Sequence, residues 1–289
     1  MAHVYYTCPF VPTELIAACG HRPCRPQPVS HPACAAAETE GLCVWAAAVV
    51  ESMTHQPDLG AAVFITACDQ MRRACELFRM HSQRPAFLLN VPKTSGLTAL
   101  TLFADEVRRL SRFLSELDDG TNGQGNLPKF LQTPHPPKPT LADKGTAIVG
   151  GPLFDADLDC LRQTLGRFGQ TIVFDGTEPA WRCYRTPGEQ SATHTDVFEA
   201  LAQCCLTTPA VWKRPAKPFF DWLDAQLKTH RVNGVILIQH PFCDYWRAAV
   251  YDLKSRLNIP VVTLETSQGG HFSSAALSRL EAFLEQCER

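Results

Sequence analysis

The sequence lacks several features that would place it in a common functional class. Its 289 residues carry a formal net charge of only −2, which gives no reason to expect nucleic acid or an anionic membrane as a partner. Its apolar runs, such as residues 46–50, fall far short of the roughly 20 residues that a membrane-spanning helix needs. The opening residues MAHVYYTCPF contain no basic segment followed by an apolar stretch, so we expect no secretory signal and a cytoplasmic protein.

Three motifs of known chemistry are also missing. The 13 cysteines include no Cys-x-x-Cys pair, which weakens thioredoxin-like and zinc-ribbon interpretations. The ten histidines form no His-Glu-x-x-His motif, and the chain has no P-loop pattern. Without a secretory signal, and with an odd count, a disulfide framework is a poor explanation for so many cysteines. We therefore expect most of them to be small core residues and a minority to bind something.

The order of elements along the chain predicts two α/β domains. Strand patterns alternate with helix patterns on both sides of a segment rich in Gly, Asn and Pro. This alternation is typical of a parallel sheet with helices on both faces. We therefore predict two doubly wound domains of the flavodoxin or Rossmann type, over residues 1–120 and 145–289, joined by a linker over 121–144.

Two strand–helix junctions have matching sequences. VFITACD and VILIQHPFCD are apolar strands that end in a cysteine followed by an aspartate, so Cys68 and Cys243 lie at helix starts with Asp69 and Asp244 as expected N-caps. Open α/β sheets bind their ligands at the carboxyl ends of strands, and a helix start favours the thiolate, the form that binds metal. Each cysteine alone is either a packed residue or a ligand. The repeated context favours ligands, which would meet if the two domains face each other across a cleft.

A third thiol in a similar setting is Cys43, which lies at a helix start in the segment GLCVW. Soft thiolates select iron–sulfur clusters or zinc, and three of them from separate segments suit a cubane cluster with one open iron. Widely separated single cysteines are weaker evidence than a compact run of them. The spacing alone therefore does not assign a metal.

Two other groups have both a functional and a structural interpretation. His240, three residues before Cys243, either contacts a substrate carbonyl or donates a proton as a catalytic residue, or it is structural. The segment RPAKPFFDW sets aromatic residues beside basic ones, a combination that could stack an adenine. We expect its aromatic residues Phe219, Phe220 and Trp222 to pack against the C-terminal sheet instead.

Four stretches of the sequence resemble those of a known family. They are YYTCPFVPTELIAACGHRP, GLCVWAAAVVES, VFITACDQMRR and the C-terminal unit that runs from GVILIQHPFCDYW through LNIPVVTLETSQ to LSRLEAFLE. In order and position they are similar to the subunits of 2-hydroxyacyl-CoA dehydratases and ATP-dependent benzoyl-CoA reductases. The resemblance implies that Cys43, Cys68 and Cys243 hold a [4Fe–4S] cluster in the cleft between the two domains, and that Cys8 is not a ligand.

The resemblance also implies a function. In this family a separate ATP-hydrolysing activator delivers one low-potential electron to the cluster. The electron passes to an acyl-CoA thioester, and the resulting ketyl radical either loses a β-hydroxyl or leads to ring reduction. The missing P-loop agrees with ATP chemistry on a partner. We therefore expect an anaerobic lyase or oxidoreductase subunit that pairs with a sibling subunit of the same family.

The chain departs from the family pattern between its two halves. Family subunits usually carry an extended helical region there, which shapes the acyl-CoA site and the subunit contact. Here that region is reduced to the linker over 121–144. The reduction favours a subunit that relays electrons or pairs with a catalytic sibling. The alternative is a non-catalytic iron–sulfur protein for electron transfer or for the scaffold of a larger redox complex.

Overall fold

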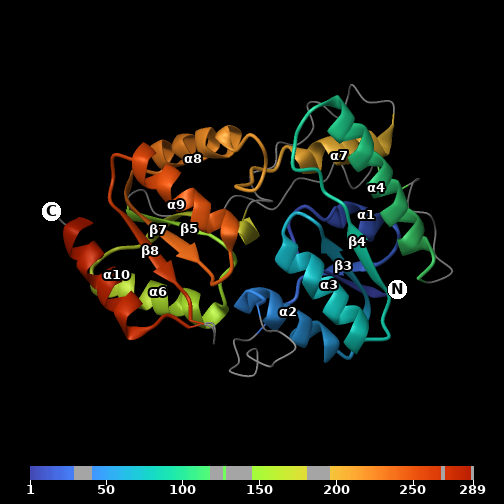
Figure 1. The fold of residues 1–289 in the computed structure, drawn as a ribbon, viewed down its shortest axis with the longest axis horizontal. Helices are drawn as coiled ribbons and strands as arrows, with labels where there is room; N and C mark the ends of the chain where they lie inside the picture. The colour runs from blue at the N-terminus through green and yellow to red at the C-terminus, as the bar shows by residue number, and fades with distance from the viewer. Residues whose placement is uncertain (29–40, 118–125, 128–144, 181–195, 268–270, 288–289) are drawn as a thin grey trace. The chain divides into compact units, whose positions relative to one another are not determined.

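The computed structural model divides the chain into two compact units, each made of interleaved segments (Figure 1). The residues that it describes are 1–28, 41–117, 126–127, 145–180, 196–267 and 271–287. Unit 1 consists of Met1–Gln27, Val49–Lys138 and Trp181–Pro215, and unit 2 of Pro28–Ala48, Pro139–Ala180 and Ala216–Arg289. The linker predicted over 121–144 lies outside the described residues except for 126–127, and the predicted domain boundaries stay a prediction.

Unit 1 contains a four-stranded parallel sheet in the order β2–β1–β3–β4. The strands are β1 (His3–Tyr6), β2 (Arg22–Cys24), β3 (Leu59–Ile65) and β4 (Ala86–Leu89). The helices are α1 (Thr13–Ala18), α2 (Val44–Thr54), α3 (Asp69–His81), α4 (Leu97–Ser115) and α7 (Val197–Leu206), and α2 begins within the unit 2 segments. All but one residue of β3 are buried, which explains its continuous apolar sequence.

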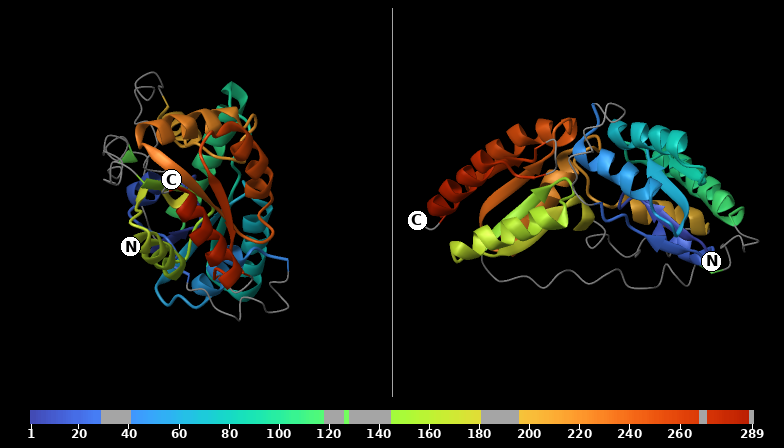
Figure 2. Two further views of the ribbon diagram at one scale, coloured as in Figure 1. Left: turned by 90° about the vertical axis from the view of Figure 1, so that its left-hand side faces the viewer. Right: turned by 90° about the horizontal axis from the view of Figure 1, so that it is seen from below.

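Unit 2 repeats this arrangement with a parallel sheet in the order β6–β5–β7–β8. The strands are β5 (Gly145–Gly150), β6 (Ile172–Thr177), β7 (Val232–Gln239) and β8 (Val261–Glu265). The helices are α6 (Asp155–Arg167), α8 (Lys217–Thr229), α9 (Asp244–Arg256) and α10 (Ser274–Cys287). Helices α6 and α10 share a core on one face of the sheet, and α8 and α9 cover the other face (Figures 1 and 2).

The two sheets have the same strand order, with the second strand at one edge and then the first, third and fourth. In doubly wound sheets of this order, the switch point where ligands bind lies between the first and third strands. Cys68 follows β3 and Cys243 follows β7, so each cysteine lies at the carboxyl end of a third strand. The predicted α/β class with two parallel sheets is confirmed.

Helix α8 occupies a segment whose prolines gave no helical pattern in the sequence. Pro218 lies in the first turn, where a missing N–H removes no helical hydrogen bond. Phe219 and Phe220 are buried, and the Trp222 ring lies 5.9 Å from that of Phe174 in β6. The prediction that these aromatic residues pack against the C-terminal sheet is confirmed for Trp222, whereas the Phe219 ring packs on Trp222 and on Trp246 of α9.

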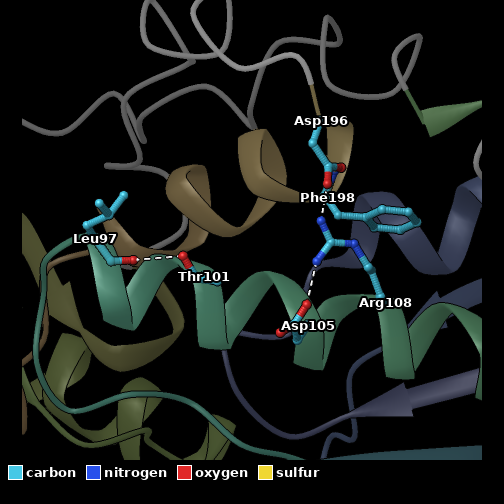
Figure 3. Close-up of polar contacts among 6 residues, drawn as sticks. All are labelled: Leu97, Thr101, Asp105, Arg108, Asp196 and Phe198. Atoms are coloured by element: carbon cyan, nitrogen blue, oxygen red, sulfur yellow. Dashed lines mark hydrogen bonds and ion pairs between the residues drawn. The ribbon is translucent and has the colours of Figure 1, made fainter.

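An arginine of α4 links helix α7 to α4 within unit 1 (Figure 3). Asp196 caps α7 by accepting a hydrogen bond of 2.8 Å from the N–H of Phe198, and its other carboxylate oxygen pairs with Arg108 of α4. The Arg108 guanidinium also pairs with Asp105 at 2.5 Å and lies 5.7 Å from the centre of the Phe198 ring.

In the parts of the chain that the structure describes, no helix combines the length and the apolar character needed to cross a bilayer.

Candidate functional site

The three predicted cysteine ligands share one local setting. None of Cys43, Cys68 and Cys243 is part of a disulfide, and each directly precedes a helix, namely α2, α3 and α9. The predicted placement at helix starts is therefore confirmed. The expectation that Asp69 and Asp244 are the N-caps is wrong, because Cys68 and Cys243 take that position and the aspartates are the first helical residues. A carboxylate in the first turn still interacts favourably with the helix dipole.

Cys43 is the most enclosed of the three thiols. Its side chain is almost fully buried, and its sulfur accepts a hydrogen bond of 3.4 Å from the N–H of Ala46. The thiol thus occupies the place of a capping oxygen at the positive end of α2. The first turn of α2 is held in unit 2 by Trp45, whose ring lies 5.2 Å from that of Phe154.

Cys68 follows a bend after the end of β3 and itself has an extended conformation, with φ −127° and ψ 134°. Its carbonyl accepts hydrogen bonds from the N–H groups of Met71 and Arg72, which start α3. Thr66, two residues before Cys68, is bound to the end of β4 by two hydrogen bonds. Its N–H donates to the carbonyl of Leu89, and its hydroxyl accepts from the N–H of Val91 at 3.1 Å. The half-buried thiol is therefore presented from a fixed strand end.

Cys243 is reached through a tight turn after β7. Its N–H donates a hydrogen bond of 3.1 Å to the carbonyl of His240, which closes a turn through Pro241 and Phe242. Phe242 has a positive φ of 63°. The carbonyl of Cys243 accepts from the N–H of Arg247 and so begins α9. The half-buried thiol is thus held at the helix start by a turn and by the helix itself.

His240 holds the beginning of this turn. It is buried, and its Nε2 lies 2.6 Å from the carbonyl oxygen of Pro152, which follows β5. A carbonyl only accepts, so Nε2 carries the proton and Nδ1 accepts from the hydroxyl of Thr266 at 2.8 Å. Burial lowers the pKa of His240 to about 4, although the Pro152 carbonyl acts in the opposite direction. A neutral imidazole therefore joins the carboxyl ends of β5, β7 and β8, while its predicted catalytic role stays a prediction.

One buried carboxylate near these strand ends was not anticipated from the sequence. Asp157 lies in the first turn of α6, is 2% exposed, and has one oxygen 3.6 Å from Nδ1 of His271. Burial raises the pKa of Asp157 to about 6, and the nearby His271 acts to lower it. His271 adjoins Phe272, which forms a β-bridge with Thr266. An acidic residue in a first helical turn is normally exposed, so the sequence carried no signal of this burial.

The three cysteines are distributed over both units of the chain. Among the described residues, no group of three or more His, Cys, Asp or Glu side chains is placed to hold a metal ion. Cys68 belongs to unit 1, whereas Cys43 and Cys243 belong to unit 2. The donor chemistry nevertheless fits an iron–sulfur cluster, because all three are cysteines outside disulfides and lie at helix starts. The shared ligand set stays a prediction.

Comparisons with known proteins were made for the family, for curated relatives and for solved structures. No curated protein matches the chain. A structure titled as the SBP FpvC from Pseudomonas aeruginosa in complex with Mn²⁺ is similar at 11% identity, with 100% of this chain and 96% of that chain covered. Its TM-score of 0.28 is too low to support any argument about this chain.

One family model matches most of the chain. The model of the family described as 2-hydroxyglutaryl-CoA dehydratase, D-component, matches residues 8–120 and 148–287. The matched ranges include three of the four strands of the unit 1 sheet, the unit 2 sheet except the first half of β5, and all three candidate cysteines. The chain therefore belongs to the 2-hydroxyglutaryl-CoA dehydratase D-component family.

Proposed function

We propose that this chain is the [4Fe–4S] subunit of a complex of the 2-hydroxyacyl-CoA dehydratase or benzoyl-CoA reductase type. Cys43, Cys68 and Cys243 would hold the cluster. The observation that carries this proposal is that each of these cysteines directly precedes a helix and lies inside a range matched by the family. Thiolates are the ligands of such clusters, and a helix start stabilises the thiolate.

Two of the proposed ligands also lie where doubly wound sheets bind their ligands. Cys68 and Cys243 follow the third strands of their sheets, next to the switch points between β1 and β3 and between β5 and β7. Their backbones are fixed by the Thr66 contacts and by the His240 contacts respectively. Rigid support of this kind orients the ligands of a metal centre.

When bound, such a cluster supplies single electrons at low potential. We propose that a separate ATP-hydrolysing activator is the electron donor and that an acyl-CoA thioester or a sibling subunit is the acceptor. The protein's own contribution is to hold the ligands, orient the acceptor and keep water away. The family supports a dehydratase-type component, and the partners and the acceptor belong to the proposal.

A second candidate function is a non-catalytic iron–sulfur subunit for electron transfer or for the scaffold of a larger redox complex. It is favoured by the short stretch of chain between α4 and β5, where family subunits usually carry an extended helical region. The two candidates differ in whether an acyl-CoA thioester binds near the cluster. A spectroscopic titration of the reduced protein separates them.

The proposal is tested on protein purified without oxygen, by iron analysis and by electron paramagnetic resonance after reduction. We expect about four iron atoms per chain in the wild type. Cys43→Ser, Cys68→Ser and Cys243→Ser should each lose most of this iron. Cys160→Ser is the matched control, because Cys160 is, like Cys68 and Cys243, a partly exposed cysteine outside any disulfide, but it lies within α6.

Unchanged iron content in Cys68→Ser and Cys243→Ser would show that the cluster assignment is wrong. If iron is lost from these variants and an acyl-CoA thioester changes the spectrum of the reduced wild type, the proposed subunit that passes electrons to an acyl-CoA thioester is supported. If the wild type binds a cluster whose spectrum no thioester changes, the non-catalytic candidate is supported instead.

A further inference from the structure

Phe242 has a backbone conformation that its side chain disfavours. It is the third residue of the turn closed by the hydrogen bond from the N–H of Cys243 to the carbonyl of His240. Pro241 fixes a negative φ at the second position, and Phe242 follows with φ 63°, so the turn is of type II. The third position of a type II turn usually holds Gly or Asn, because a Cβ atom is crowded there.

The fold provides no evident reason for an aromatic residue at this position. The other non-glycine residue with a positive φ in the described chain is Arg231, with φ 46°. Arg231 follows the C-cap of α8, where a left-handed residue is a common helix stop. Phe242 ends no helix, and 46% of its surface is exposed to solvent. By contrast, Trp246 on the following helix is buried and packs on Phe219.

The strained turn is well supported on both sides. His240 is held by Pro152 and Thr266, and Cys243 is held by the first turn of α9. A strained backbone persists only where the surrounding structure imposes it, and such positions cluster at functional sites. Here the strain presents an exposed ring at the carboxyl end of β7, beside the switch point with β5.

We propose that Phe242 is a substrate-binding residue whose ring contacts the apolar acyl part of an acyl-CoA thioester. This inference rests on the proposed function and adds the chemical group that unit 2 would recognise. An exposed ring favours an apolar ligand, which removes both surfaces from water. The acyl end fits better than the nucleotide end, because the exposed carboxylate of Asp244 lies two residues away and repels phosphates.

The test separates the ring from the strain by using two variants that both remove the ring. Phe242→Ala keeps a Cβ atom in the left-handed conformation, and Phe242→Gly does not. We expect Phe242→Gly to melt about 2 to 4 °C above Phe242→Ala, because it relieves the strained position. Both variants should bind butyryl-CoA about tenfold more weakly than the wild type, since each loses the same apolar contact.

The measurements are thermal unfolding and calorimetric titration of the full chain with butyryl-CoA and with free CoA, together with iron analysis of every sample. Free CoA should bind the wild type and the ring-deleted variants equally, and Phe242→Leu should keep most of the affinity for butyryl-CoA. Tyr251→Ala is the matched control, because Tyr251 is an aromatic residue on α9 that is 78% exposed and has ordinary helical geometry. It should leave the butyryl-CoA affinity unchanged.

Three results would overturn the proposal. In the first, the wild type and Phe242→Ala bind butyryl-CoA with equal affinity. In the second, Phe242→Gly binds butyryl-CoA as tightly as the wild type while Phe242→Ala binds it weakly. In the third, the wild type does not bind butyryl-CoA. The second result would show that turn rigidity matters and the ring does not. Iron analysis of the cysteine variants tests the cluster independently, so a failure of the cluster assignment is distinguished from a failure of the Phe242 contact.

Discussion

Protonation of His240 should destabilise unit 2 as the pH falls. The imidazole is buried and uncharged, with Nε2 donating to Pro152 and Nδ1 accepting from Thr266. A second proton on Nδ1 would replace this accepted hydrogen bond with two facing donors, unless the hydroxyl turns away. It would also place a charge where water is excluded, which is why burial lowers the pKa.

The size of the effect follows from the two pKa values. Because the pKa falls from 6.5 to about 4 on folding, the unfolded chain binds more protons between these values. The contribution of His240 to stability is therefore complete above pH 6.5 and is lost as the pH falls toward 4. Linkage gives a loss of about 2 kcal/mol in the free energy of unfolding at pH 5, and of about 3 kcal/mol at pH 4.

The assay is urea unfolding between pH 7.5 and 5, with His240→Gln as the non-titrating comparison. A glutamine amide can donate to the Pro152 carbonyl, and its oxygen can accept from the Thr266 hydroxyl. The difference in unfolding free energy between the wild type and the variant removes the titration of every other group. We expect this difference to shift against the wild type by about 2 kcal/mol from pH 7.5 to 5.

A pH-independent difference between the two proteins would refute the reasoning. It would mean that His240 keeps an ordinary pKa in the folded protein and is reached by water. A shift in the opposite direction, with the wild type gaining stability in acid, would require a partner that stabilises the imidazolium. The described structure shows Pro152 and Thr266 as the hydrogen-bond partners of the ring, and neither is an acid.

Two further predictions concern other charged groups. Asp157→Asn should gain about 2 kcal/mol in the free energy of unfolding relative to the wild type as the pH rises from 4 to 7, measured by urea unfolding. The reason is that the raised pKa of about 6 makes ionisation of the buried Asp157 carboxylate unfavourable in the folded wild type. If the variant gains nothing, the charged pair with His271 compensates for the burial of the carboxylate. A double-mutant cycle on Arg108 and Asp196 should give a coupling of about 1 kcal/mol in unfolding free energy, because the pair is half-buried and hydrogen-bonded. The same cycle on Arg108 and Asp105 should give less than about 0.5 kcal/mol, because Asp105 is largely exposed, and equal couplings would contradict the role given to Asp196.

The sequence was sufficient for most of the fold because its local signals were strong and consistent. The amphipathic pattern of α4 and the apolar runs of β3 and β7 indicate their elements without tertiary information. Helix α8 was missed because prolines near its start resemble loop punctuation, and its amphipathic aromatic face became clear only when it was packed against β6. The exchange of segments between the two units depends on long-range packing, which no local pattern reports.

The helix-start positions of the candidate cysteines were predictable from the sequence, whereas their surroundings were not. The recurrence of Cys–Asp after two apolar strands was enough to select Cys68 and Cys243, and the structure places both at helix starts. The burial of Asp157 and both contacts of His240 depend on residues distant in sequence, so sequence spacing could not reveal them. The left-handed backbone of Phe242 was equally hidden, because a phenylalanine gives no signal for a conformation that it disfavours.

The two third-strand ends also differ in a way that bears on function. In unit 1 a bend over residues 66–68 joins β3 to α3 without a positive φ, whereas in unit 2 a strained turn lies between β7 and Cys243. Because the two sheets have the same strand order, this difference is not imposed by topology. The turn adds a buried histidine that fixes three strand ends and an exposed ring beside the thiol. Because the unit 1 junction holds its cysteine without a strained residue, the strain at Phe242 is not needed to position a thiol, which is why we propose unit 2 as the part of the chain that meets the acyl group.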